Sequence, residues 1–483
     1  SDGWRTARVA PNCDANWPVT GLAAVHVHMS GTTPVASEGA KEPELRRAIG
    51  GRMLIIFIIG DILGAGVYGL VGKLSPHVGG AVWLPLLVGF TVAGLTAGSY
   101  AELVGKYPRA AGAALYTHRA WGKPFFTFLV AFAVMMSGVA SASAAAILFG
   151  GNYLQKLVAA PEMIAAFGFL GMITLVNFIG ISESIIVNLV LTIIEVSGLV
   201  IVLVVGVIGI AMGNGEPTRA FELDTPNGVF LGILGATALG FYALIGFEDS
   251  VNLAEECDEP HRTFPIALFT GIIITGAVYI AVTFVAVALV EPTAFASTSA
   301  PLLLVVESAG LYFPPEAFAV IALLAIANTA LINMMMASRL MYGMANERIV
   351  PSVFARVHPS RKTPYVAIIF TVLIAMGLIA SGTASELAAT TVLLLLVVFT
   401  IVNVAVLVLR KKPVDHPHFK TPTWAPILGG LTTLVMATPL ADRPPRVYAV
   451  AGILLGVGAA LWGINRLISG KPIAEIDPEK LVK

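Results

Sequence analysis

The chain has 483 residues, of which 57% are hydrophobic and only 12% are charged, and its formal net charge is zero. This composition excludes a string of soluble domains, because so apolar a chain dissolves mainly in lipid. A neutral chain also gives no electrostatic reason to bind nucleic acid.

The first 44 residues are polar and are expected to form an N-terminal tail. Residues 1–28 have no apolar periodicity, and Met29 would make an ordinary bacterial start, so we interpret 1–28 as a tag or upstream sequence. No cleavable signal peptide is visible, because the tail is polar up to about Arg52.

Apolar windows of about 20 residues predict an all-α membrane protein with twelve spanning helices. The windows cover residues 51–76, 80–104, 122–150, 160–180, 184–211, 229–255, 263–291, 314–345, 364–382, 386–409, 424–442 and 446–468. The first ten belong to a predicted transport core at 45–410. Helices 11 and 12 occupy 411–468, and a C-terminal tail follows at 469–483.

Positive charge predicts the orientation of these helices. With the N-terminus inside, most of the 29 Lys and Arg residues fall in the tails and the inside loops. The residues left outside are Lys73, Lys156, Arg219, Arg443 and Arg446. Because cytoplasmic loops carry such an excess, both termini are expected in the cytoplasm of a multi-pass plasma membrane protein, the inner membrane in a bacterium.

The first spanning segment is interrupted near its middle by Gly60-Asp-Ile-Leu-Gly-Ala-Gly66. Each glycine weakens a helix by about 1 kcal/mol relative to alanine, and a carboxylate at this depth costs about 2.5–3.5 kcal/mol more. The sixth helix carries a matching pair, Gly240 and Gly246, at a similar distance from its start. Two interrupted helices that open two five-helix halves indicate inverted repeats, at about 51–211 and 229–409, with a binding site at the membrane midplane.

An opened helix exposes backbone groups that can hold an amino acid. Free N–H groups bind a carboxylate and free C=O groups bind an ammonium group. Glycine at positions 64 and 66, with small Ala65 between them, lets a ligand approach the backbone closely. The alternative is close helix packing through the glycines, which would not explain Asp61.

Three groups of motifs resemble the amino acid–polyamine–organocation (APC) superfamily. They are Gly60-Asp-Ile-Leu-Gly-Ala-Gly-Val-Tyr68, the run Ile245–Glu256 with Glu259–Ala267, and Asn328-Thr-Ala330 with Ser338–Ala345. The resemblance extends from about 45 to 410 and is not specific to one substrate. It implies a LeuT-like fold with broken helices 1 and 6, and helices 11 and 12 outside the ten-helix core.

The resemblance also implies roles for single residues. The N–H groups of Gly64, Ala65 and Gly66 would take the substrate carboxylate. The C=O groups of Ile62, Tyr242 and Ile245 would take its amino group, with Phe241 beside them in the site.

Tyr242 would also gate the site, although a tyrosine there could simply pack in the core. Glu248 matches an acidic position near the cytoplasmic gate of related antiporters; the alternative is a buried glutamate satisfied by neighbouring hydroxyls. Ser137 and Ala142 belong to a face of small residues on helix 3, which fits a pocket wall or tight packing equally well. Because no Lys or Arg lies in the central parts of helices 1, 3, 6, 8 and 10, we expect a neutral or cationic amino acid.

Glu195 lies near the midpoint of an otherwise apolar helix and is the first candidate for a proton site. An unpaired carboxyl group there would be neutral, and it could bind and release a proton as access alternates. Proton-coupled relatives often carry a lysine at the matching position, so this chain departs from that pattern. The alternative for Glu195 is a hydrogen bond to Ser197 or to a neighbouring helix that serves packing alone. Asp61 is the rival proton site, or else a cap for the exposed N–H groups after the break.

We therefore predict a secondary active transporter that imports an amino acid by proton symport and alternating access. Exchange of amino acids or amines, polyamine uptake, and a membrane amino-acid sensor are the alternatives. No P-loop, HExxH, CxxC or GxSxG motif occurs, so we expect neither an enzyme nor a cofactor or metal site. The expected partners are the amino acid, protons and the lipid bilayer, and the sequence identifies no accessory subunit.

Overall fold

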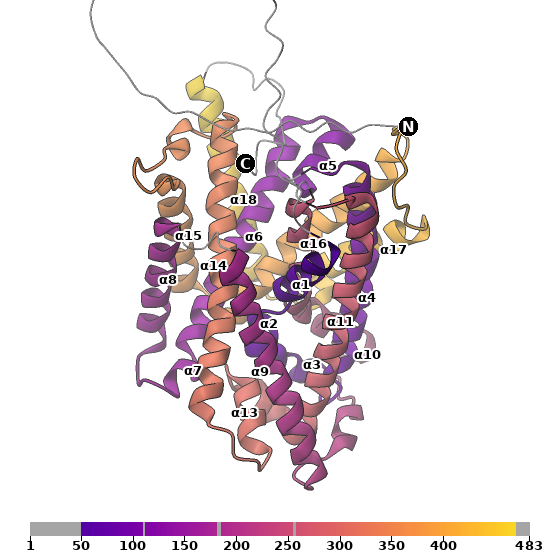
Figure 1. Ribbon diagram of the computed structural model, residues 1–483, viewed down its shortest axis with the longest axis vertical. Coiled ribbons are helices and arrows are strands. Elements are labelled where there is room, and N and C mark those ends of the chain that lie inside the picture. Colours follow the sequence, from indigo (N-terminus) through magenta and orange to yellow (C-terminus); the bar gives the residue numbers. More distant parts are fainter. Residues whose placement is uncertain (1–49, 110–111, 181–184, 255–256, 470–483) are drawn as a thin grey trace, which may run out of the picture. The chain divides into compact units, whose positions relative to one another are not determined.

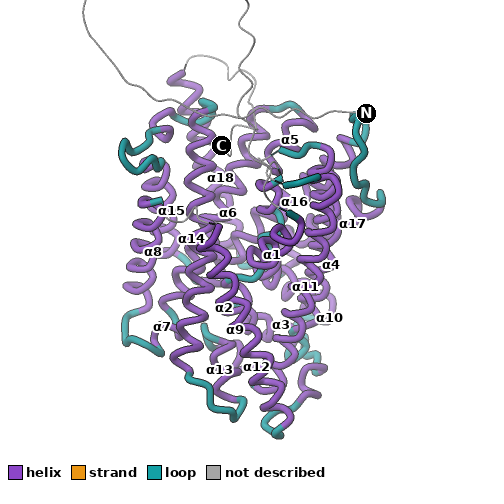
Figure 2. Tube along the Cα trace, viewed as in Figure 1, coloured by secondary structure: helices purple, strands orange, loops and turns teal. Residues whose placement is uncertain are grey.

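The structure is a computed structural model that describes residues 50–109, 112–180, 185–254 and 257–469. The expected N-terminal tail, and the expected C-terminal tail beyond residue 469, lie outside these residues. Within the described residues the chain forms helices and loops, and no strand (Figure 2).

The α-helices follow the chain in the order of their labels in Figure 1. They are α1 (Gly51–Ile62), α2 (Ala65–Gly69), α3 (Ser75–Val78), α4 (Trp83–Lys106), α5 (Gly112–Trp121), α6 (Pro124–Gly150), α7 (Asn152–Gln155), α8 (Glu162–Ile179), α9 (Ile185–Ala211), α10 (Val229–Gly240), α11 (Pro260–Leu289), α12 (Pro292–Ser297), α13 (Pro301–Ser308), α14 (Pro315–Asn346), α15 (Tyr365–Ser381), α16 (Ala384–Leu409), α17 (Trp424–Ala437) and α18 (Pro445–Ser469). Short 3-10 helices are η1 (Val71–Leu74), η3 (Pro217–Phe221), η4 (Phe241–Leu244), η5 (Asp249–Leu253), η6 (Ser352–Ala355) and η7 (Pro439–Ala441).

Ten helical segments of the described chain are long and apolar enough to cross a membrane. Two shorter apolar helices, α15 with 17 residues and α17 with 14, coincide with the ninth and eleventh predicted windows. The predicted ends are close to those observed; α9, for example, ends at Ala211, where the apolar window ends. The all-helical membrane architecture is therefore confirmed, and the total of twelve spans stays a prediction.

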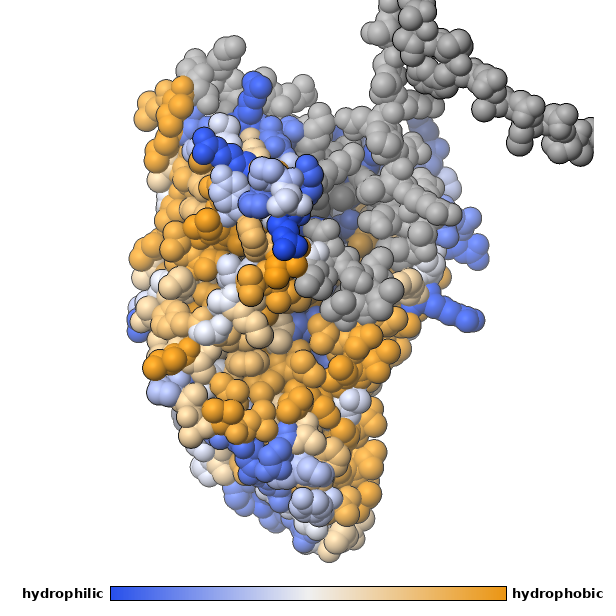
Figure 3. Space-filling model, turned by 60° about the vertical axis from the view of Figure 1, so that its left-hand side comes forward, coloured by the Kyte–Doolittle hydropathy of each residue, from blue (hydrophilic) through white to orange (hydrophobic). Residues whose placement is uncertain are grey.

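The surface supports the same conclusion. Figure 3 shows a broad hydrophobic band across the described residues, with hydrophilic residues gathered towards both ends. Large apolar side chains are exposed along the helices of this surface, including Ile164 on α8, Leu373 on α15 and Val204 on α9. A contiguous apolar band of this extent is typical of a surface that faces lipid.

Two groups of helices surround the interior. In the first, α6 packs against α14 and α16; in the second, α11 packs against α4 and α1 (Figure 1). Small residues permit these close crossings. A Cβ atom at Gly138 of α6 would lie 3.3 Å from the Asn333 side chain of α14, and one at Gly271 of α11 would lie 2.5 Å from Ile58 of α1.

An ion pair links α4 to the start of the segment between α16 and α17. The Arg410 guanidinium donates two hydrogen bonds to Glu102, from Nε to Oε1 at 2.8 Å and from an Nη to Oε2 at 2.6 Å. The Thr421 N–H donates to the same carboxylate at 2.9 Å. These bonds to Glu102 raise the pKa of Arg410 above its usual value. Since Glu102 is almost fully buried, the pair holds this segment onto α4.

Breaking this pair should destabilise the protein. In Arg410→Gln the buried Glu102 carboxylate loses its charged partner, and we expect a loss of about 3 kcal/mol, the lower end of the cost for buried pairs, because Arg410 itself remains partly exposed. The matched control is Arg446→Gln, whose contact with Glu386 is long and exposed and should be worth less than about 1 kcal/mol. Denaturant titration in mixed micelles measures both; equal losses would contradict a special role for the pair.

Candidate functional site

The first predicted break is present between α1 and α2. Leu63 and Gly64 adopt extended backbone conformations and separate the two helices. Thr329 on α14 takes up one freed group, because its Oγ1 accepts a hydrogen bond from the Ala65 N–H at 3.0 Å. Tyr279 on α11 takes up another, because its hydroxyl donates to the Ile62 C=O at 3.0 Å. The break is therefore held open by two side chains from other helices.

The second predicted break follows η4. Ile245 is extended, and Gly246 has a φ of +122°, which strongly favours glycine. The Gly246 N–H donates to Oε2 of Glu248 at 2.8 Å. The alternative for Glu248 invoked neighbouring hydroxyls, whereas the partner that the structure gives its Oε2 is a backbone amide of the break.

The two breaks touch each other. A Cβ atom at Gly246 would lie 2.4 Å from the Asp61 carbonyl oxygen, and one at Gly66 would lie 2.6 Å from the Ala243 Cα. Such distances leave no room for a side chain. The glycines therefore let one opened backbone cross the other in direct contact.

A cavity lies beside this crossing. It is lined by both breaks together with α4, α5, α6, α14 and α16, and about 100 Å³ of it is open to the centres of water-sized molecules. That is room for on the order of seven to ten waters, which suits a solute the size of an amino acid.

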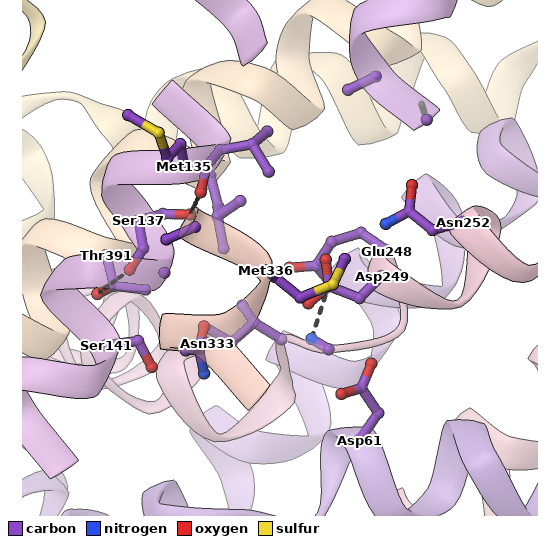
Figure 4. Close-up of a pocket in the computed structure, with 18 of the residues that line it drawn as sticks. Asp61, Met135, Ser137, Ser141, Glu248, Asp249, Asn252, Asn333, Met336 and Thr391 are labelled. Carbon is purple, nitrogen blue, oxygen red and sulfur yellow. Dashed lines mark hydrogen bonds between the residues drawn. The ribbon is translucent and has the colours of Figure 1, made fainter. Parts of the chain in front are cut away.

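Carboxylates gather on one side of the cavity and hydroxyls on the other. Figure 4 shows Asp61, Glu248 and Asp249 on one side, with Ser137 and Ser141 opposite. Among the described residues that line it there is no Lys, Arg or His. The cavity therefore offers carboxyl groups that can pair with a cation, and no cationic side chain of the described lining is available to pair with an acidic solute.

Most of the predicted substrate-site residues line this cavity. They are Ile62, Gly64, Ala65, Gly66, Ser137, Tyr242 and Ile245, joined by Glu248 and Asp61. The Tyr242 hydroxyl lies 3.1 Å from Ser141 Oγ and so connects η4 to α6 across the cavity.

Ala142 and Phe241 are buried but do not line the cavity. Ala142 is five residues after Ser137 on α6, so it turns about 140° away from that face of the helix. Phe241 packs against Phe399 of α16 with 6.2 Å between ring centroids.

Several residues that line the cavity were not predicted from the sequence. Asp249, Thr329, Asn333 and Asn252 all carry polar groups into the cavity wall. Thr329 belongs to a motif that had been noticed for its family resemblance alone. Asp249 directly follows Glu248, and its position after a broken helix was the signal that could have identified it.

Glu195 lies outside the cavity and is completely buried in α9. Neither of its carboxyl oxygens makes a hydrogen bond of good geometry with the described residues, but the Asn328 side chain of the neighbouring helix α14 lies close enough to act as a donor. The Ser197 hydroxyl donates instead to the Ile194 C=O, so the alternative in which Ser197 binds the carboxyl group is not observed. Packing around it is tight, since a Cβ atom at Gly60 of α1 would lie 2.3 Å from Thr192, one turn before Glu195.

The groups that face Glu195 electrostatically come from four elements. They are Asp61 of α1, Tyr68 of α2, Tyr279 of α11 and Asn328 of α14. The Tyr68 hydroxyl donates to the backbone C=O of Glu195 at 2.6 Å and not to its carboxylate. No cationic side chain is therefore paired with Glu195 in the described part of the chain.

Asp61 lines the cavity, yet its Oδ2 is buried with no hydrogen-bond partner in the residues described. In the alternative, Asp61 caps the N–H groups after the break, but the Ala65 amide among them is held by Thr329. A metal site has no support here: in the described residues no group of three or more His, Cys, Asp or Glu side chains could hold one.

Comparison with known proteins gives a consistent result. A sequence model described as amino acid permease matches residues 49–458. Branched-chain amino acid permease BcaP of Bacillus subtilis is 28% identical over 415 residues, which cover 81% of this chain and 87% of the relative. Methylthioribose transporter of Bacillus subtilis is 26% identical and covers 80% of this chain and 85% of the relative. Cationic amino acid transporter 9, chloroplastic, of Arabidopsis thaliana is 28% identical and covers 65% of this chain and 58% of the relative.

Proposed function

Because the chain belongs to the amino acid permease family, we propose that it is a secondary active transporter that imports a neutral or cationic amino acid across the plasma membrane by proton symport. The observation that carries the proposal is the cavity at the crossing of two opened helices. Such a crossing combines backbone donors and acceptors with room for a small zwitterion.

The proposed substrate lies with its two charged ends on the backbone. Its carboxylate accepts from the N–H groups of Gly64, Ala65 and Gly66. Its ammonium group donates to the C=O groups of Ile62, Tyr242 and Ile245. Support comes from the lining of the cavity, to which all six residues belong.

The carboxyl groups in the cavity wall support a neutral or cationic substrate. Asp61, Glu248 and Asp249 interact electrostatically with one another and have no cationic neighbour among the described lining residues. An acidic side chain on the substrate would find no cationic partner in this lining, whereas a cationic side chain could pair with these carboxyl groups.

Glu195 supports the coupling to protons. A fully buried carboxyl group with no cationic partner is costly when charged, so its proton is expected to leave only when the surroundings change. Asp61 interacts with Glu195 on one side and lines the cavity on the other. We therefore assign Glu195 as the proton-binding group, with Asp61 as the second candidate.

The helix contacts support two related halves that could rock against each other. Each helix of the first half has a counterpart in the second half, and replacing every helix of an observed contact by its counterpart gives another observed contact. The pairs of counterparts are α1 and α10, α4 and α11, α6 and α14, α8 and α15, and α9 and α16. For example, α1 packs on α11 as α10 packs on α4, and α9 packs on α14 as α16 packs on α6. This matching favours an inverted repeat and alternating access around the crossing.

The cavity wall includes residues of α5 and of η5. Arg109 precedes α5 and Arg119 lies in it, and both are among the basic residues that we place in the cytoplasm. We propose that this side opens to the cytoplasm. Tyr242, tethered to Ser141, then closes the opposite side as a gate, and Glu248 belongs to the cytoplasmic gate.

Uptake by the purified protein in liposomes tests the function. Labelled amino acids should accumulate when the outside is acidified, and neutral and cationic substrates should compete more strongly than aspartate or glutamate. Uptake that ignores the pH gradient yet requires internal amino acid would replace symport by exchange. Binding without any uptake would indicate a sensor.

The acidic wall of the cavity also favours one alternative, the uptake or exchange of amines and polyamines. These solutes lack the carboxylate that the break of α1 would hold, but they match the carboxyl groups of Asp61, Glu248 and Asp249. Competition by putrescine or spermidine at least equal to that by amino acids would favour this alternative.

A further inference from the structure

Both backbone groups at the break of α1 are already engaged by hydroxyl groups. The Thr329 Oγ1 accepts from the Ala65 N–H at 3.0 Å, as a substrate carboxylate would. The Tyr279 hydroxyl donates to the Ile62 C=O at 3.0 Å, as a substrate ammonium group would. These two side chains therefore make the same kinds of contact as the two ends of a zwitterion would.

The two contacts differ in whether the backbone group can still form a hydrogen bond to a substrate. A carbonyl oxygen has two lone pairs, so Ile62 can keep Tyr279 and still accept from an ammonium group. An amide N–H has a single hydrogen, so Ala65 cannot make full hydrogen bonds to Thr329 and to a carboxylate together. Only the Thr329 contact must be given up when an amino acid binds.

The position of Thr329 fits this competition. It lines the same cavity as the break, and a Cβ atom at Gly64 would lie only 2.8 Å from its Oγ1. Its own bond to the Ala325 C=O in the preceding turn of α14 is long, at 3.4 Å, so that turn holds the hydroxyl weakly. A carboxylate forms a hydrogen bond roughly twice as strong as a neutral acceptor does, so it can displace the hydroxyl.

We propose that Thr329 competes with the substrate carboxylate: its hydroxyl holds the Ala65 amide while the site is empty and gives way when an amino acid binds. This inference rests on the proposed amino acid site. It adds Thr329 on α14 as a positioning residue. It also predicts that substrate binding breaks one contact between α14 and α2. The carboxylate thus replaces one hydrogen bond between α2 and α14, while Tyr279 continues to hold Ile62.

The experiment measures binding to the purified full chain. A thermal-shift screen of all twenty protein amino acids selects the one that stabilises the wild type most. Its dissociation constant, and that of the amine that lacks the carboxylate, are then measured by titration; agmatine is that amine for arginine and 3-methylbutylamine for leucine. The variants are Thr329→Val, Thr329→Cys and Thr329→Ser.

Thr329→Val removes the competing acceptor, so the amino acid should bind about two- to tenfold more tightly, the net worth of one hydrogen bond. The empty variant should be less heat-stable than the wild type. Thr329→Cys keeps a weak acceptor and should fall between, and Thr329→Ser should behave like the wild type. Affinity for the amine should change less than twofold, because the amine brings no carboxylate.

A role in folding alone would lower stability and affinity together, whereas the competition lowers stability and raises affinity for the amino acid. The matched control is Thr371→Val on α15, which removes a buried hydroxyl bonded within its own helix and should leave both affinities unchanged. Weaker amino acid binding in Thr329→Val and Thr329→Cys would overturn the competition. A wild type that none of the twenty amino acids stabilises would instead overturn the proposed function, and the inference with it.

Discussion

Replacing Glu195 by glutamine should abolish the accumulation of substrate driven by a pH gradient. If one proton accompanies each neutral amino acid, a gradient of one pH unit corresponds to about 1.4 kcal/mol and supports about tenfold accumulation. Glutamine has the shape of the protonated carboxyl group but cannot release a proton, so accumulation should fall to about the level without a gradient. Uptake into liposomes with an imposed pH difference measures this directly.

The same variant should retain exchange of labelled for unlabelled substrate, because Glu195 lies outside the cavity that binds the amino acid. The control is Glu162→Gln, an exposed glutamate at the start of α8, which should leave accumulation unchanged. Full accumulation in Glu195→Gln would remove this residue from the mechanism. If Asp61→Asn alone loses accumulation, the proton site is Asp61.

The helices and their interruptions could be predicted because they depend on local sequence. Apolar windows placed the ends of the spanning segments within a few residues. The stretch from Gly60 to Gly66 identified the first break, since glycines and a carboxylate are costly in a membrane helix. The matching pair, Gly240 and Gly246, identified the second break, and both occur where predicted.

The contacts between the breaks could not be predicted, because they join residues far apart in the sequence. The approach of Gly66 to Ala243 and the bond from the Ala65 amide to Thr329 both depend on how the helices pack. Asp61 illustrates the consequence. Its position suggested a cap for the exposed amides, yet a threonine from α14 holds the Ala65 amide, and Asp61 is left with an unpartnered oxygen.

Glu195 is a second residue whose burial could be predicted from the sequence but whose hydrogen-bond partners could not. Its place in an apolar helix predicted burial, and the structure confirms it. The sequence alone left open whether Ser197 would satisfy the carboxyl group. Ser197 bonds to its own helix because its hydroxyl reaches the C=O three residues earlier, a choice that depends on the side-chain rotamer.

Replacing Gly246 by alanine should reduce transport on the order of 100-fold. A φ of +122° strains any residue with a Cβ atom, by about 1–3 kcal/mol. The new methyl group would also lie 2.4 Å from the Asp61 carbonyl oxygen and 3.1 Å from the Ile62 nitrogen, both backbone atoms of the other break. Overpacking of this kind costs about 1–3 kcal/mol more, and about 1.4 kcal/mol corresponds to a tenfold change.

The loss in Gly246→Ala should come from the site and not from the spanning helix as such. Gly94→Ala on α4 is the matched control, because nothing lies within 4 Å of the added methyl group, and alanine there should stabilise the helix by up to about 1 kcal/mol. Gly66→Ala, which would approach the Ala243 Cα at 2.6 Å, should impair initial uptake as Gly246→Ala does. Near-normal uptake by Gly246→Ala would mean that the two breaks need not cross in contact during transport. Loss of uptake in both Gly246→Ala and Gly66→Ala, with normal uptake in Gly94→Ala, would assign the effect to the crossing. Each of the first two glycines contacts the backbone of the other interrupted helix.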